Sequence, residues 1–138
     1  LGLEINKGIV ILGQLTPSEM AKHLSNSKIT VIPSKKEPYG IFVAEALCCG
    51  SPVVATNVGG IPEVIELAKK NLNSIEQGVF DGWVKLVDPE VAAIRAGIDI
   101  LLKNYNGLEE YIKLVPKIRE QFSWSKRLEQ YNSILPVY

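Results

Sequence analysis

Short apolar runs alternate along the chain with longer segments of helical periodicity. Residues 8–13 form an apolar run between two glycines, and residues 28–33 and 52–55 form two more. Apolar runs of this length predict strands buried on both faces. Helices are predicted at residues 16–26, 41–49 and 62–70, and nearby glycine and proline residues indicate where they begin or end. Strands that alternate with helices across short loops indicate an α/β fold with a parallel, Rossmann-like sheet flanked by helices.

The second half of the chain is predicted to be mostly helical after one ambiguous stretch. Residues 71–78 are polar and turn-like, and residues 79–87 predict a strand or two short extended pieces. Three helices follow: residues 91–104, residues 108–122 with a kink at Pro116, and a last one after Ser123 that carries Leu128, Tyr131 and Leu135. We therefore treat residues 1–138 as one domain, with residues 108–138 as its C-terminal helices.

Composition excludes several classes of protein. The 138 residues are 46% hydrophobic and 22% charged, which excludes a disordered or low-complexity chain. Fifteen basic and 15 acidic residues give a formal charge of zero, so electrostatic binding to nucleic acid is not expected. No secretory signal or membrane-spanning run is recognisable, and the two cysteines, Cys48 and Cys49, are neighbours that rarely bridge. These features favour a reduced, cytoplasmic location.

Glu45 is the first candidate functional residue. It is the one charged side chain of the apolar helix predicted at residues 41–49, where it shares a face with Ile41, Cys48 and Cys49. We expect its carboxylate to be partly buried and therefore to need hydrogen bonds or a cation. It is either a structural glutamate bonded to amides of a neighbouring loop or a group that binds ligand hydroxyls.

The loop before this helix is the second candidate. Gly40 lies where strand passes to helix, so the amides of Gly40, Ile41 and Phe42 would point out of a helix N-terminus, which favours anions. Glu37 lies in the same loop and could face the same ligand. Many such turns bind nothing, and an isolated loop glutamate is usually a solvated residue, so only the combination is informative.

These residues belong to a longer motif that resembles a known family. Residues 33–40 read Pro-Ser-x-x-Glu-Pro-Tyr-Gly, and residues 45–63 read Glu-Ala-Leu-x-x-Gly-x-Pro-Val-Val-Ala-Thr-x-Val-Gly-Gly-Ile-Pro-Glu. The run resembles the retaining GT-B glycosyltransferases of family 4, among the group 1 glycosyl transferases, with their E-x7-E motif. Residues 82–89 and 122–124 are similar to further elements of that family. Most of the chain is therefore covered by the resemblance.

The resemblance implies an activity and a set of roles. The reaction would transfer a hexose from a nucleotide-sugar, such as a UDP-, GDP- or ADP-hexose, to a sugar, lipid or polysaccharide acceptor with retention of configuration. Glu37 and Glu45 would act at the catalytic site, on the hexose and ribose hydroxyls respectively. The donor site would also include Leu15, Thr16, Tyr39, Gly40, Ile41 and Phe42. No cofactor and no metal is expected, because a helix N-terminus and cations would neutralise the diphosphate.

The same resemblance implies that the chain is the later part of a C-terminal, donor-binding domain. The N-terminal domain, which would contact the acceptor or a membrane surface, and the phosphate-binding Arg and Lys would precede it. The fragment alone would then be inactive, and its uncovered sheet edge would be a surface for self-association. Residues 71–81 depart from the family's short turn and could form a loop near the cleft.

Two other functions remain open at this point. The chain could be a nucleotide-sugar binding or regulatory module that has lost catalysis, or a Rossmann-like domain with an unrelated ligand. The remaining notable residues are assigned structural or surface positions: His23, Lys35 and Lys36 at the surface, Glu63 in the first turn of a helix, and Cys48, Cys49, Trp83 and Trp124 in packing.

Overall fold

Three parallel strands joined by helices form the centre of the molecule. The computed structural model describes residues 8–126 and 128–129. Its elements are α1 (Pro17–Asn26), β1 (Thr30–Ile32), α2 (Ile41–Cys48), β2 (Val53–Thr56), α3 (Ile61–Lys69), α4 (Ser74–Trp83), β3 (Val84–Val87), α5 (Val91–Lys103), α6 (Leu108–Ile112) and α7 (Val115–Gln121). The parallel α/β architecture predicted from the sequence is confirmed.

The strands lie in the order β1-β2-β3, so consecutive strands are neighbours. Thr30 pairs with Val53, and Val53 pairs in turn with Val84. All four residues of β2 are buried, as expected of a central strand covered on both faces. Because all strands run the same way, the loops that follow β1 and β2 emerge at the same edge of the sheet, where open α/β proteins bind ligands.

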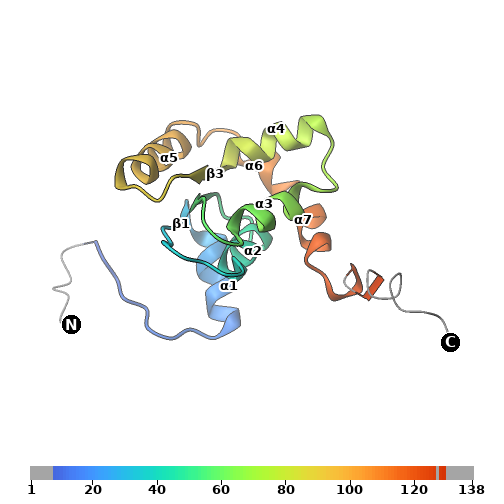
Figure 1. Cartoon of the computed structure of the whole chain (residues 1–138), viewed down its shortest axis with the longest axis horizontal. Coiled ribbons are helices and arrows are strands. Elements are labelled where there is room, and N and C mark those ends of the chain that lie inside the picture. The colour runs from blue at the N-terminus through green and yellow to red at the C-terminus, as the bar shows by residue number, and fades with distance from the viewer. Residues whose placement is uncertain (1–7, 127, 130–138) are drawn as a thin grey trace.

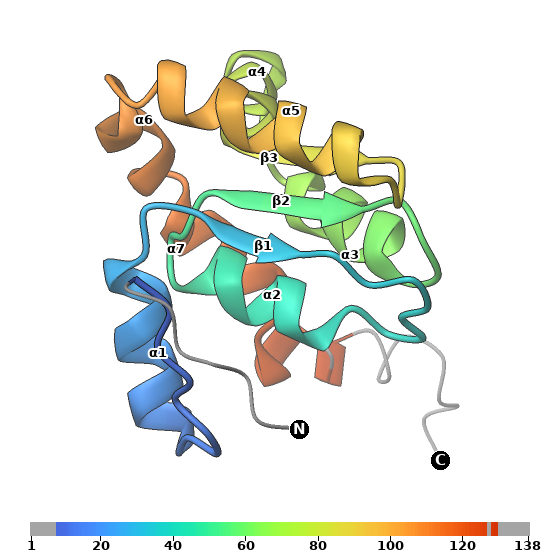
Figure 2. The same ribbon diagram turned by 90° about the vertical axis from the view of Figure 1, so that its left-hand side faces the viewer.

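Helices cover both faces of this sheet. Figures 1 and 2 show the strands between α5 on one side and α2 and α3 on the other. The α5 helix approaches the sheet closely at Gly97, where an added Cβ would lie 3.0 Å from Cγ1 of Val54. Aromatic side chains fill the core beside α4 and α6. Trp83 contacts Tyr105 edge-on, and the Tyr111 hydroxyl donates a hydrogen bond to the Ser51 carbonyl. The packing role predicted for Trp83 is confirmed.

Most element boundaries follow local signals in the sequence. Thr16 and Glu19 form a capping box at the start of α1, each accepting an amide hydrogen bond from the other. Gly50 ends α2 with a φ of 76°, as its position after an apolar helix predicts. The kink predicted at Pro116 is a break between two helices: α6 ends at Ile112, and Pro116 stands in the first turn of α7, where proline is tolerated.

The predicted strand at residues 8–13 is wrong. Residues 9–12 are not in a strand, and their four apolar side chains are exposed: Ile9 by 60%, Val10 by 77%, Ile11 by 60% and Leu12 by 48%. An apolar run becomes a strand only where a neighbouring strand supplies backbone partners. None of the three described strands pairs with this segment.

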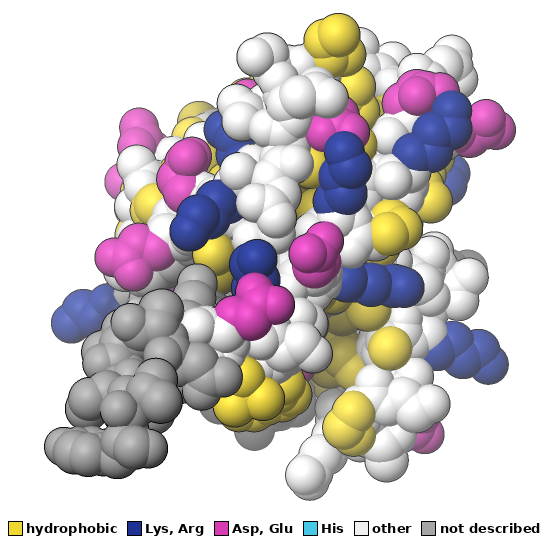
Figure 3. Space-filling view, turned by 90° about the vertical axis from the view of Figure 1, so that its right-hand side faces the viewer, with side chains coloured by type: hydrophobic (Ala, Val, Ile, Leu, Met, Phe, Trp, Pro, Cys, Tyr) yellow, Lys and Arg dark blue, Asp and Glu magenta, His cyan; other side chains and the backbone are white. Residues whose placement is uncertain are grey.

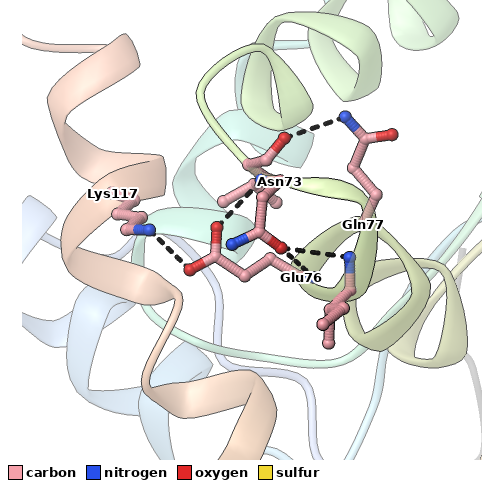
Figure 4. A network of polar contacts seen from close by, with 6 residues as sticks. Asn73, Glu76, Gln77 and Lys117 are labelled. Atoms are coloured by element: carbon pink, nitrogen blue, oxygen red, sulfur yellow. Dashed lines mark hydrogen bonds and ion pairs between the residues drawn. The ribbon is translucent and has the colours of Figure 1, made fainter.

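The turn predicted at residues 71–78 and the extended segment from residue 79 are also wrong, since residues 74–83 form α4 and only residues 84–87 are a strand. Asn73 caps this helix by accepting from the amides of Ile75 and Glu76, and the Glu76 carboxylate accepts from the Asn73 amide (Figure 4). Glu76 also pairs with Lys117 of α7. Residues 71–81 are therefore part of the fold and not a loop beside a cleft.

The hydrogen bonds of Glu76 make the stability of the folded chain depend on pH. Hydrogen bonds from Lys117 and from the Asn73 amide hold the pKa of Glu76 below its ordinary value of 4.5. Because the folded pKa is lowered, the stabilisation is complete above the unfolded pKa and is lost as pH falls through the folded one. We expect urea unfolding to show this loss below about pH 4.5. A Lys117→Met variant should show a smaller loss, and an equal loss would contradict the assignment.

The surface agrees with a neutral chain. On the face shown in Figure 3, acidic and basic side chains are interspersed. Within the described residues, no helix is long and apolar enough to cross a membrane.

The outer edge of β1 is unpaired among the described strands, and self-association there stays a prediction. Residues 130–138, with Tyr131 and Leu135 of the last predicted helix, lie outside the described residues.

Candidate functional site

The loop between β1 and α2 contains the first candidate residues. It ends at Gly40, which caps α2 with a φ of 70° and a left-handed backbone. A Cβ at this position would lie 3.1 Å from Cγ2 of Val64 and 3.3 Å from Cα of Ile61. Both the positive φ and the close approach require glycine. The prediction that Gly40 shapes the passage from strand to helix is confirmed.

Glu37 folds back over the N-terminus of α2. Its Oε1 accepts hydrogen bonds from the Gly40 amide at 3.1 Å and from the Tyr39 amide at 3.4 Å. The Gly40 amide is therefore already engaged, contrary to the expectation of a free donor there. The amides of Ile41 and Phe42 follow in the first turn, where an α-helix has no internal acceptors. In this structure a carboxylate of the chain itself occupies part of the predicted anion site.

A second loop holds Glu37 in place from the β2 side. The Gly60 amide donates to the Glu37 carbonyl at 2.8 Å. An added Cβ at Gly59 would lie 1.9 Å from that same carbonyl oxygen, and one at Gly60 would lie 2.6 Å from the Pro38 carbonyl oxygen. Thr56 donates from its hydroxyl to the Ser34 carbonyl at 2.6 Å. The Gly-Gly sequence therefore lets two loops at the same edge of the sheet interlock.

Glu45 lies on the outer face of α2 and is exposed. Our expectation of a partly buried carboxylate is wrong, because Val43, Ala46 and Leu47 turn the other face of α2 into the core. Water can solvate the carboxylate, so its charge needs no compensating partner inside the protein. No hydrogen bond or ion pair joins the Glu45 side chain to the residues that the structure describes.

Glu45 lines a hollow of about 340 Å³ between α2 and α1. Leu15, from the turn before α1, lines the same hollow, as the sequence-based assignment of both residues to one site requires. Thr16 is beside it in sequence, but its hydroxyl is engaged with Glu19 in the capping box. The remaining lining residues are Pro17, Met20, Ala21, Leu24, Cys48 and Cys49.

The two glutamates do not line a common hollow. Glu37 lines a separate one of about 280 Å³ together with Lys35 and Lys36, which are exposed as expected. Tyr39 and Ile41 lie in a third, apolar groove of about 670 Å³. The α2 helix lines two of these surfaces: Ile41 and Ala44 border the apolar groove, and Glu45 borders the hollow beside α1. Within residues 8–126 and 128–129, no cluster of His, Cys, Asp or Glu is placed to hold a metal ion.

Comparison with known proteins decides the family. The model of the glycosyl transferases group 1 matches residues 1–121. The chain belongs to this family. An uncharacterized glycosyltransferase of Methanocaldococcus jannaschii is 34% identical over 124 residues, which are 88% of this chain and 28% of that protein. Alpha-maltose-1-phosphate synthase of Mycobacterium tuberculosis is 46% identical over 55 residues, covering 40% of this chain and 14% of the synthase.

A third relative is the D-inositol 3-phosphate glycosyltransferase of Corynebacterium jeikeium. It is 34% identical over 70 residues, which are 51% of this chain and 17% of that protein. The chain thus spans less than a third of the length of each of these three relatives. The resemblance stated from the motif is confirmed at the level of the family.

Sequence reasoning misplaced several side chains of this chain. Trp124, assigned to packing, is 82% exposed and borders the apolar groove beside Tyr39. Cys48 and Cys49 are half-buried and face the hollow of Glu45, where packing alone was predicted. Helical spacing already placed them on the face of Glu45, so that face could have predicted their position. His23 is exposed and Glu63 lies in the first turn of α3, both as expected.

Proposed function

We propose that this chain is the donor-binding part of a GT-B hexosyltransferase that uses a nucleotide-sugar and retains the anomeric configuration. The observation that carries the proposal is the placement of Glu45, which is exposed, lines one hollow together with Leu15 and lies one helical turn from the N-terminus of α2. An exposed carboxylate beside an apolar wall suits a ribose whose base contacts that wall. The names of the relatives, a maltose-1-phosphate synthase and an inositol phosphate glycosyltransferase, support glycosyl transfer.

Each residue then has a chemical task. Glu45 accepts hydrogen bonds from the ribose hydroxyls, and Leu15 and Thr16 lie beside the base. Glu37 accepts from hydroxyls of the hexose, while Tyr39 and the amides of Gly40, Ile41 and Phe42 approach the sugar and the diphosphate. The positive end of the α2 dipole stabilises the charge that develops on the leaving diphosphate. No metal or cofactor is part of this proposal.

Donor binding requires one rearrangement at Glu37. Its carboxylate now accepts from the Gly40 amide, and two anions cannot share that donor without repulsion. We infer that Glu37 releases the amide to the diphosphate and turns to the hexose hydroxyls. In the reaction, the bond from the anomeric carbon to the diphosphate oxygen breaks, a bond to the acceptor oxygen forms on the same face, and the acceptor proton leaves with the diphosphate.

Calorimetric titration of the complete enzyme tests the proposal. The titrants are UDP-, GDP- and ADP-hexoses, and we expect saturable binding of at least one of them together with transfer to an acceptor. Binding without transfer would support a non-catalytic module instead. Absence of binding by every nucleotide-sugar would overturn the proposed donor site.

A further inference from the structure

The two adjacent thiols in the hollow of Glu45 have no role in the proposed function. Cys48 is the last residue of α2 and Cys49 is its C-cap, and both are free. Both residues line the hollow together with Met20. Three sulfur-containing residues therefore line one surface depression that is otherwise mostly apolar.

These thiols are poorly suited to the usual reactions of cysteine. Burial raises the pKa of both, and the negative charge of Glu45 adds to this effect, while Arg119 opposes it. Thiols that stay protonated are slow in alkylation and in disulfide exchange, because the thiolate is the nucleophile. A disulfide between them is also unfavourable, since neighbouring Cα atoms lie about 3.8 Å apart and disulfides usually need about 4.4 Å or more.

We propose that Cys48 and Cys49 form a chelating dithiol site for trivalent arsenic compounds. An arsenic atom between the two sulfurs enlarges the ring that neighbouring cysteines close, so the sulfurs stay farther apart than in a direct S–S bond and the ring is less strained. The step is a condensation: an arsonous acid R–As(OH)2 and two thiols give R–As(S-Cys)2 and two water molecules. Each thiol proton leaves with one hydroxide, and arsenic remains trivalent, so neither an oxidant nor a reductant is needed.

The surroundings fit an aryl arsenical in particular. The side chains of Leu15, Pro17 and Leu24 give the hollow an apolar wall that can take a phenyl ring, and Met20 adds a polarizable sulfur. The hollow of about 340 Å³ has room for a group of this size. Because Glu45 lines the same hollow, the arsenical and the nucleoside of the donor would exclude each other. This last consequence rests on the proposed function, whereas the dithiol site does not.

Titration of the 138-residue chain with phenylarsine oxide, followed by intact mass spectrometry, tests the dithiol site. We expect one adduct per chain that 2,3-dimercaptopropanol removes and that glutathione does not. Cys48→Ala and Cys49→Ala should each weaken binding about 100-fold or more, because two linked contacts bind far more tightly than one. Alanine keeps these half-buried positions small and apolar, and circular dichroism checks that the variants fold. Equally tight adducts on a single-cysteine variant, or no adduct on the unaltered chain, would overturn the proposal.

A competition arm separates this proposal from the proposed function. Adduct formation by the complete enzyme should slow in the presence of the nucleotide-sugar that it binds. If that nucleotide-sugar binds without slowing the adduct, the shared hollow is wrong. If the adduct forms and no nucleotide-sugar binds, the proposed donor site fails and the dithiol site is supported by itself.

Discussion

Replacing Glu45 by glutamine is expected to lower kcat/KM of the complete enzyme by about 10- to 150-fold, because a hydrogen bond to a charged group contributes about 1.5–3 kcal/mol. Glutamine keeps the size of the side chain and one acceptor oxygen but removes the charge. Since Glu45 is exposed and has no partner among the described residues, the substitution should leave the fold intact. Steady-state kinetics with varied donor should show the loss mainly in KM, as expected for a contact with the ribose.

Glu109→Gln is the matched control. Glu109 is also an exposed helical glutamate, but it lies on α6 and lines none of the hollows around α2. Its variant should retain the kinetics of the unaltered enzyme. Full activity of the Glu45 variant would refute the ribose role, and equal losses in both variants would indicate a general effect of charge.

The sequence predicted the sheet and the loops around α2 because their signals are local. Capping by Thr16, the left-handed Gly40 and the terminator Gly50 each act within one or two turns of a helix. Three consecutive parallel strands joined by short helices also leave few possible orders of the strands in the sheet. The pattern of residues alone was therefore enough to place the chemistry-bearing loop at the carboxyl edge of the sheet.

The wrong assignments concern features that depend on distant partners. Residues 9–12 have the apolar pattern of a strand but no described strand beside them. Tryptophan is usually a packing residue, but its burial depends on which other segments of the chain cover it. Trp124 is 82% exposed. The burial of Glu45 depends on which face of α2 meets the sheet, and an almost wholly apolar helix does not reveal that face.

The helix α4 was missed for a different reason, since its signal is present in the sequence. Asn73 and Glu76 have the spacing of a capping box. The polar, turn-like composition of residues 71–78 outweighed it in our interpretation, and Gly78 and Gly82 are no obstacle to a helix, since both are exposed and an added Cβ at either meets nothing within 4 Å. A glycine inside a helix costs only about 1 kcal/mol, so it does not decide against a well-capped helix.

Gly59 is the position where a single methyl group should be most disruptive. An added Cβ would lie 1.9 Å from the Glu37 carbonyl oxygen, and the backbone φ of 55° is unfavourable for alanine. The carbonyl belongs to the motif loop, so relief of the strain requires the Gly59 loop and the Glu37 loop to move apart. Backbone strain and overpacking each cost about 1–3 kcal/mol. We expect Gly59→Ala to lower the free energy of unfolding by about 2–4 kcal/mol in urea titrations.

Gly78→Ala supplies the control, because it makes the same change in the exposed middle of α4, where nothing lies within 4 Å. It should raise stability by about 0.5–1 kcal/mol, since alanine is the better helix former. If the two substitutions have the same effect, the two loops do not interlock through Gly59. If Gly59→Ala proves too unstable to purify while Gly78→Ala is stable, the direction of the prediction holds. Donor binding should also weaken in the Gly59 variant, because the clash disturbs the loop that carries Glu37 and Gly40, the N-cap of α2.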